Sequence, residues 1–93
     1  MERIYLDYAS TTPADPEVIR EMLPYFSGIY GNPSSVHAFG REARKVVDSV
    51  REKVARFIGA KPHEIVFTSG GTESDNTAVK GIAYAARSRG DQL

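Results

Sequence analysis

The fold is decided by the stretch Glu64-Ile65-Val66-Phe67-Thr68-Ser69-Gly70-Gly71-Thr72-Glu73-Ser74-Asp75-Asn76. It opens with β-branched and aromatic side chains, which are typical of a buried strand. Two glycines end this run, and Thr72 with Asp75 three residues later has the form of a capping box that starts a helix. We therefore predict a strand at 64–69 and a helix at 72–88, joined by a glycine turn.

Such a turn would place free backbone N–H groups at the positive end of a helix dipole, where a phosphate fits. No lysine follows the glycines and a third glycine is missing, so the turn matches neither G-x-x-x-x-G-K-[ST] nor G-x-G-x-x-G. The remaining donors are the amides of Gly70, Gly71 and Thr72 and the Thr72 hydroxyl, which suit a phosphate monoester better than a triphosphate. On local pattern alone, a plain tight turn with a self-capped helix explains these residues equally well.

Composition excludes several classes of function. The 93 residues carry 12 basic and 12 acidic side chains, a balance that argues against nucleic acid or an anionic membrane as partner. No apolar run approaches the roughly 18 residues of a membrane span, and the first residues lack the pattern of a signal peptide, so we expect a cytoplasmic protein. The chain has no cysteine, which excludes a disulfide, a thiolate metal site or a thiol nucleophile within it.

The residues before this stretch predict helices joined by loops. Asp15 and Pro16 form a strong helix start, and Pro24 is expected to kink the last turn of that helix. Apolar residues then recur at steps of three and four, with mixed charges on the opposite face, until Gly59. The predicted elements are an arm (1–15), a helix (16–26), a loop (27–37) and a long amphipathic helix (38–58).

The pattern indicates an incomplete fold. Gly90 reads as the stop of the last helix, and 91–93 would open a further strand. A single strand has no ladder partner for its backbone groups, so we expect an N-terminal piece of a larger α/β protein. The alternative is a complete small domain in which residues 4–6 supply a second strand.

The two histidines suggest no metal site, because neither has a partner ligand at suitable spacing. His63 follows a proline in a polar loop and reads as a surface residue. His37 precedes the long helix and reads as a helix-start residue that hydrogen-bonds nearby backbone. A catalytic triad of Ser10, His37 and Asp7 is disfavoured because no nucleophile-elbow sequence surrounds the serine.

Three blocks in order resemble the opening of the cysteine desulfurases, the NifS- and IscS-like pyridoxal-phosphate enzymes of the class V aminotransferase group. They are Tyr5-Leu6-Asp7-Tyr8-Ala9-Ser10-Thr11-Thr12-Pro13, Gly31-Asn32-Pro33-Ser34-Ser35 with His37, and the stretch quoted first. Together they cover essentially the whole chain.

The resemblance implies an α/β fold, namely the N-terminal part of the large domain of the aspartate-aminotransferase-like, fold type I enzymes. It further implies a homodimer that uses pyridoxal 5'-phosphate to remove sulfur from L-cysteine, giving L-alanine and an enzyme-bound persulfide. The sulfur would serve iron–sulfur cluster assembly or thiolation through an acceptor or scaffold protein. The family's phosphate-binding Gly-Thr pair maps onto Gly71 and Thr72. The loops 7–13 and 31–37 look like segments around the active-site mouth and the dimer contact.

No catalytic residue is expected within this segment. The family's Schiff-base lysine follows a Ser-x-His motif that is absent here, and the persulfide cysteine is absent too. We therefore predict that the 93-residue polypeptide alone is inactive and folds stably only with the rest of its protein. Two alternatives stay open: a related class V enzyme, such as a selenocysteine lyase or an aminotransferase, and a non-catalytic phosphate-binding fragment.

Overall fold

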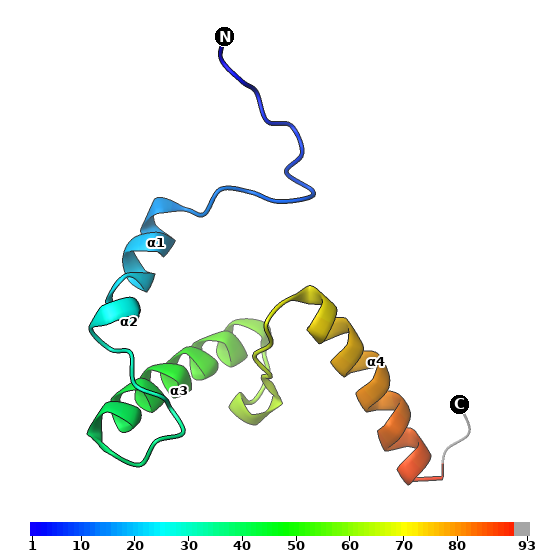
Figure 1. Ribbon diagram of the computed structural model, residues 1–93. Helices are drawn as coiled ribbons and strands as arrows, with labels where there is room; N and C mark the ends of the chain where they lie inside the picture. The colour runs from blue at the N-terminus through cyan, green and yellow to red at the C-terminus, as the bar shows by residue number, and fades with distance from the viewer. Residues whose placement is uncertain (91–93) are drawn as a thin grey trace. The chain divides into compact units, whose positions relative to one another are not determined.

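The computed structural model describes residues 1–90, so the strand start predicted at 91–93 lies outside the described residues. The chain divides into two compact units, Met1–Val50 and Arg51–Leu93. In chain order the elements are α1 (Pro16–Met22), α2 (Pro24–Ser27), α3 (Ala38–Ile58), the 3-10 helix η1 (Pro62–Glu64) and α4 (Gly71–Ser88) (Figure 1).

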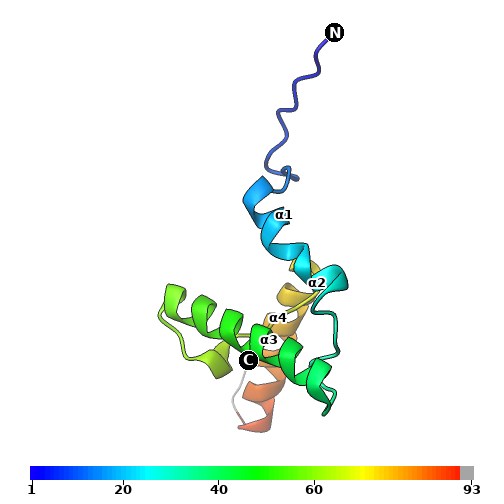
Figure 2. The same ribbon diagram turned by 90° about the vertical axis from the view of Figure 1, so that its left-hand side faces the viewer.

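The first unit begins with an arm that contains neither helix nor strand (Figure 2). Helix α1 starts as predicted, because the Asp15 carboxylate accepts the backbone N–H of Glu17 at 2.8 Å and Pro16 takes the first helical position. The helix predicted at 16–26 is interrupted at Leu23. Pro24 has no N–H to continue the ladder, so it starts the separate turn α2.

Helix α3 has the predicted bounds, Ala38–Ile58. Gly59 ends it in the left-handed conformation, with φ of 72°. The Ala60 N–H bonds the Ala55 carbonyl at 2.8 Å, and the Gly59 N–H bonds the Arg56 carbonyl at 3.4 Å. These two bonds form a Schellman motif, which satisfies the last carbonyls of the helix.

The strand predicted at 64–69 is not formed among the described residues. Glu64 belongs to η1, where its carboxylate accepts the backbone N–H of Lys61 at 2.7 Å. Ile65 is extended, with φ of −93° and ψ of 125°, and residues 65–68 have no ladder partner. A strand exists only when a neighbour accepts its hydrogen bonds, so an extended segment alone does not become one.

Helix α4 runs as one uninterrupted rod (Figure 1). It stops as predicted at Gly90, which has φ of 78° and donates its N–H to the Arg87 carbonyl at 3.0 Å. The buried hydrophobic residues among 1–90 are three alanines: Ala43, Ala55 and Ala86. The larger side chains on α4, such as Val79 and Ile82, remain about 70% exposed (70% and 69%). Among residues 1–90 no helix is long and apolar enough to cross a membrane.

Candidate anion-binding turn before α4

The candidate site is the turn from Thr68 to Thr72, where the chain enters α4. Gly70 is the N-cap with an extended backbone, φ 167° and ψ −177°, and Gly71 is the first helical residue. Thr72 therefore lies inside the first turn. The capping box predicted for Thr72 and Asp75 is wrong, because the helix begins one residue earlier than the predicted 72–88 and Gly70 takes the capping position.

Glu73, and not the predicted Asp75, is the acidic side chain that hydrogen-bonds back to the residues before the helix. Its carboxylate accepts the backbone N–H of Ser69 at 2.8 Å and also the Ser69 hydroxyl. The hydrogen bond from the Ser69 hydroxyl, and then that from its N–H, lower the pKa of Glu73 below its ordinary value. The negative charge of the Glu73 carboxylate is thus hydrogen-bonded to Ser69, before the two glycines of the turn.

The peptide between Gly70 and Gly71 is fixed through its carbonyl. The Gly70 carbonyl accepts the Ser74 N–H at 3.1 Å, and the hydroxyls of Ser74 and Thr68 lie 3.1 and 3.2 Å from it. These hydroxyls also lie 2.6 Å from each other, so their two protons serve two of the three contacts at a time. Because the peptide unit is planar and trans, holding this carbonyl sets the opposite direction for the N–H of Gly71.

The amides at this turn are open. No hydrogen bond within residues 1–90 engages the backbone N–H of Gly71 or of Thr72. Both residues are exposed, and a Cβ built on Gly70 or Gly71 would meet nothing within 4 Å. Free N–H groups at the positive end of an 18-residue helix are donors for an anion. Two of the donors predicted for a phosphate, the amides of Gly71 and Thr72, are therefore unengaged within residues 1–90, and the phosphate site stays a prediction.

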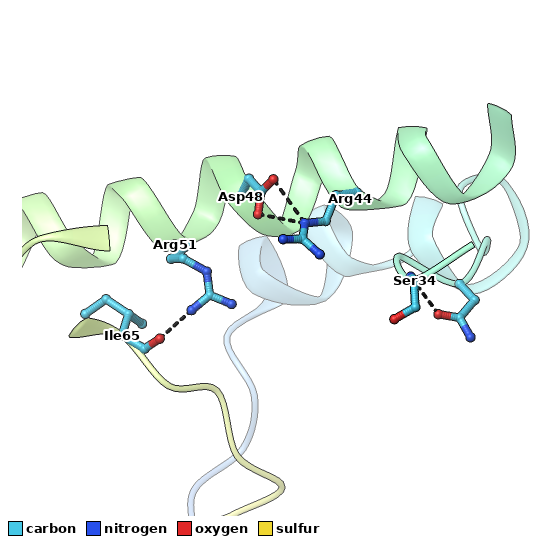
Figure 3. A network of polar contacts seen from close by, with 6 residues as sticks. Ser34, Arg44, Asp48, Arg51 and Ile65 are labelled. Carbon is cyan, nitrogen blue, oxygen red and sulfur yellow. Dashed lines mark hydrogen bonds and ion pairs between the residues drawn. The ribbon is translucent and has the colours of Figure 1, made fainter. Parts of the chain in front are cut away.

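The loop before α3 is a contrasting helix entry. The Asn32 side chain accepts the Ser34 N–H at 2.9 Å, one of the bonds drawn in Figure 3. His37 Nδ1 accepts the Gly40 N–H at 3.3 Å, which confirms its predicted role at the helix start. The described residues contain no group of three or more metal-ligating side chains.

Sequence reasoning placed Gly71 and Thr72 at the turn but missed the side chains that shape it. Ser69 and Glu73 are four residues apart, and so are Gly70 and Ser74, which is the reach of a helix's first turn. That spacing was visible in the sequence. It was missed because the start of the helix was assigned to the hydroxyl residue Thr72 and not to the glycine before it.

The sequence profile of the family described as Aminotransferase class-V matches residues 4–93. The chain belongs to this family.

Relatives in the class V family support the same assignment. The chain is 58% identical over its whole length to a Bacillus subtilis (strain 168) protein with the provisional name cysteine desulfurase IscS 1, and it covers 24% of that protein. It is 53% identical, over 97% of its length, to the cysteine desulfurase IscS of Dictyoglomus turgidum, covering 23% of it. The chain thus spans about a quarter of the length of these relatives.

A solved structure named NIFS-like protein matches 95% of this chain with a TM-score of 0.86 and 42% identity, and the chain covers 24% of it. This match and the family confirm the expected fold class: the N-terminal part of the α/β large domain of the aspartate-aminotransferase-like, fold type I enzymes. The described part of this segment is helical, because the strands of a sheet need partners that this segment does not provide.

Proposed function

We propose that this chain is the N-terminal segment of a pyridoxal-phosphate-dependent cysteine desulfurase. In such an enzyme sulfur leaves L-cysteine to form a persulfide on an enzyme cysteine, and L-alanine remains. Membership of the class V family supports the proposal, as do the names of relatives up to 58% identical to the chain. The single observation that carries it in the structure is the open pair of amides at Gly71 and Thr72.

We propose Gly71 and Thr72 as the cofactor-binding residues of this segment. Their backbone N–H groups and the Thr72 hydroxyl would hold the phosphate of pyridoxal 5'-phosphate. The residues fit this group, because Gly71 has no side chain to block a close approach and Ser69 engages the nearby Glu73 carboxylate. The bound cofactor supplies an electron sink for chemistry at the substrate's α-carbon, and this segment contributes binding and orientation.

The reacting groups are assigned to polypeptide outside this sequence. The chain has no cysteine to receive sulfur. All four of its lysines are exposed and belong to helices or to the start of η1: Lys45, Lys53, Lys61 and Lys80. We therefore expect the 93-residue polypeptide alone to release no sulfide from L-cysteine in the presence of pyridoxal phosphate. Sulfide release by this polypeptide would contradict the assignment.

The remaining parts of the proposal concern the whole enzyme. We propose a cytoplasmic homodimer that passes sulfur to an acceptor or iron–sulfur scaffold protein. The support is the resemblance of the loops 7–13 and 31–37 to segments that line the active-site mouth and dimer contact in cysteine desulfurases.

The deciding experiment uses the full-length protein that carries this segment. We expect a pyridoxal absorbance band, and we expect L-cysteine to be converted to L-alanine in the presence of a thiol that releases the sulfur. L-selenocysteine and an amino acid with a 2-oxo acid acceptor serve as comparison substrates. A protein that binds the cofactor but acts only on a comparison substrate would be one of the related class V enzymes. A full-length protein that binds no cofactor would support the non-catalytic alternative.

A further inference from the structure

Arg51 of α3 makes two contacts with the extended segment that leads to the turn. Its guanidinium donates from Nη1 to the backbone carbonyl of Ile65, as Figure 3 shows. The same group lies over the ring of Phe67, with 4.9 Å between the guanidinium carbon and the ring centre. One planar cation thus engages both the backbone and a side chain within three consecutive residues.

These contacts join Arg51 to residues that are 14 and 16 positions away in the sequence. Arg51 and Ile65 are both half-buried, so the contact is partly shielded from water. Among residues 1–90, no other side chain of α3 forms a hydrogen bond or ion pair with residues 62–70. Arg51 is therefore the polar link between α3 and the residues just before Gly70.

Arg44 on the same helix provides a built-in comparison. Its guanidinium bonds the Asp48 carboxylate one turn away at 3.1 Å, and both side chains are about half exposed or more (61% and 48%). Figure 3 shows this pair lying along α3 itself. Arg44 thus has the same charge as Arg51 and lies on the same helix, but its hydrogen bonds within residues 1–90 stay on α3 itself.

We propose that Arg51 is a positioning residue for the turn from Thr68 to Thr72, an inference that rests on the proposed function. By holding Ile65 and Phe67 against α3, Arg51 fixes where the chain enters the turn. The open N–H groups of Gly71 and Thr72 follow four to seven residues later. The direction of the Gly71 N–H is already set, because Thr68 and Ser74 hold the Gly70 carbonyl of the same peptide. Arg51 itself is not assigned to the cofactor or to the reacting atoms.

The test compares single variants of the full-length protein. Arg51→Met keeps most of the apolar stem and removes the donor and the charge, and Arg44→Met is the matched control. We expect Arg51→Met to weaken pyridoxal phosphate binding about tenfold, which equals about 1.4 kcal/mol, while Arg44→Met changes it less than twofold. Arg51→Lys should rescue little, because an ammonium has no planar fork to bond the carbonyl and stack on the ring together.

A second measurement does not depend on the cofactor. Amide hydrogen exchange in the cofactor-free protein should speed up at Ile65 and Ser69, whose N–H groups have acceptors, in Arg51→Met and stay unchanged there in Arg44→Met. A general loss of stability would instead raise exchange throughout the protein and leave cofactor affinity intact well below the melting temperature. If Arg51→Met does not fold, Arg51→Lys and Phe67→Leu serve in its place.

The two proposals fail in different ways. Cofactor affinity and local exchange that both match the wild type in the Arg51 and Phe67 variants would overturn the role of Arg51. A wild-type protein that binds no pyridoxal phosphate, or a Thr72→Ala variant that binds it normally, would overturn the proposed function or its site. In that case the exchange data would still show whether Arg51 holds the segment.

Discussion

The entries to α3 and α4 use glycine in opposite ways. At α3 the glycines allow backbone to touch backbone: a Cβ on Gly40 would lie 2.2 Å from the Ser35 carbonyl oxygen, and one on Gly31 would lie 2.3 Å from that of Phe39. At α4 a Cβ on Gly70 or Gly71 would meet nothing within 4 Å. At the start of α3 the backbone of neighbouring residues fills the space beside the glycines, and at the start of α4 that space is empty.

The capping groups differ in the same way. His37 Nδ1 accepts the Gly40 N–H at 3.3 Å, so a side chain engages one of the amides at the α3 entry. Glu73 accepts the Ser69 N–H, and no group within residues 1–90 accepts the amides of Gly71 and Thr72. A glycine-rich helix entry therefore predicts an anion site only where the protein's own groups do not fill it.

The largest expected effect is at the start of α3. Gly40→Ala should destabilise the full-length protein by about 3 kcal/mol, because the new methyl group would overlap the backbone oxygens of Ser35 and Asn32, which have little freedom to move. Gly81→Ala in α4 is the matched control, since a Cβ there meets nothing within 4 Å, and it should stabilise by up to about 1 kcal/mol. Denaturant unfolding measures both changes. Equal effects of the two substitutions would show that the space beside Gly40 is not filled.

The next effect concerns the start of α4. Thr72→Ala should weaken pyridoxal phosphate binding by about 1–3 kcal/mol through loss of one hydroxyl donor to a dianion, with little change in stability. Thr72→Ser keeps the hydroxyl and should bind nearly as well as the wild type. Titration of the cofactor-free protein, followed by absorbance, checks both variants. Affinity that is lost equally in Thr72→Ser would point to the methyl group and not to the hydroxyl.

Removing the cap at α3 should have a smaller effect. His37→Ala should destabilise the full-length protein by about 1 kcal/mol, because the Gly40 N–H loses its acceptor. His37→Asn offers a shorter acceptor that is favoured at helix starts, and it should recover most of the loss. Thermal unfolding of the three proteins decides the point. If alanine and asparagine behave alike, the bond from Gly40 does not contribute.

The smallest expected effect is the pH dependence of Glu73. Its pKa is lowered in the folded protein, so its charged form adds stability above the unfolded-state pKa, near the ordinary value of 4.5. That contribution is lost as the pH falls through the lowered pKa. The melting temperatures of the wild type and Glu73→Gln should therefore differ at neutral pH and converge in acid. A difference that is constant across this range would rule out the carboxylate charge as the cause.

Much of the fold could be predicted from local signals. Asp15 with Pro16, Gly59 and Gly90 are short-range start and stop signals. They predicted the start of α1 and the ends of α3 and α4, because caps act through neighbouring backbone groups. The strand at 64–69 could not be decided in this way, because its hydrogen bonds depend on partners distant in sequence.

For the site, the sequence predicted a turn that enters a helix at 70–72, which the structure shows, but it assigned the cap to Thr72 and not to Gly70. A hydroxyl residue is the commoner helix cap, so Thr72 competed with Gly70 for the position, and the bond from Ser69 to Glu73 decides between them only in three dimensions. The contact of Arg51 with Ile65 and Phe67 had no short-range signal at all, because it joins a helix face to residues 14 and 16 positions away.

The held carbonyl of Gly70 has a consequence for how a ligand would arrive. Turning over the peptide that joins Gly70 to Gly71 would break the bond from the Ser74 N–H, at 3.1 Å, and at least one bond from the hydroxyls of Thr68 and Ser74. The direction of the Gly71 N–H is therefore fixed before any ligand binds. For the phosphate site that we propose here, we expect binding to need no rearrangement of this peptide, so that no binding free energy is spent on turning it.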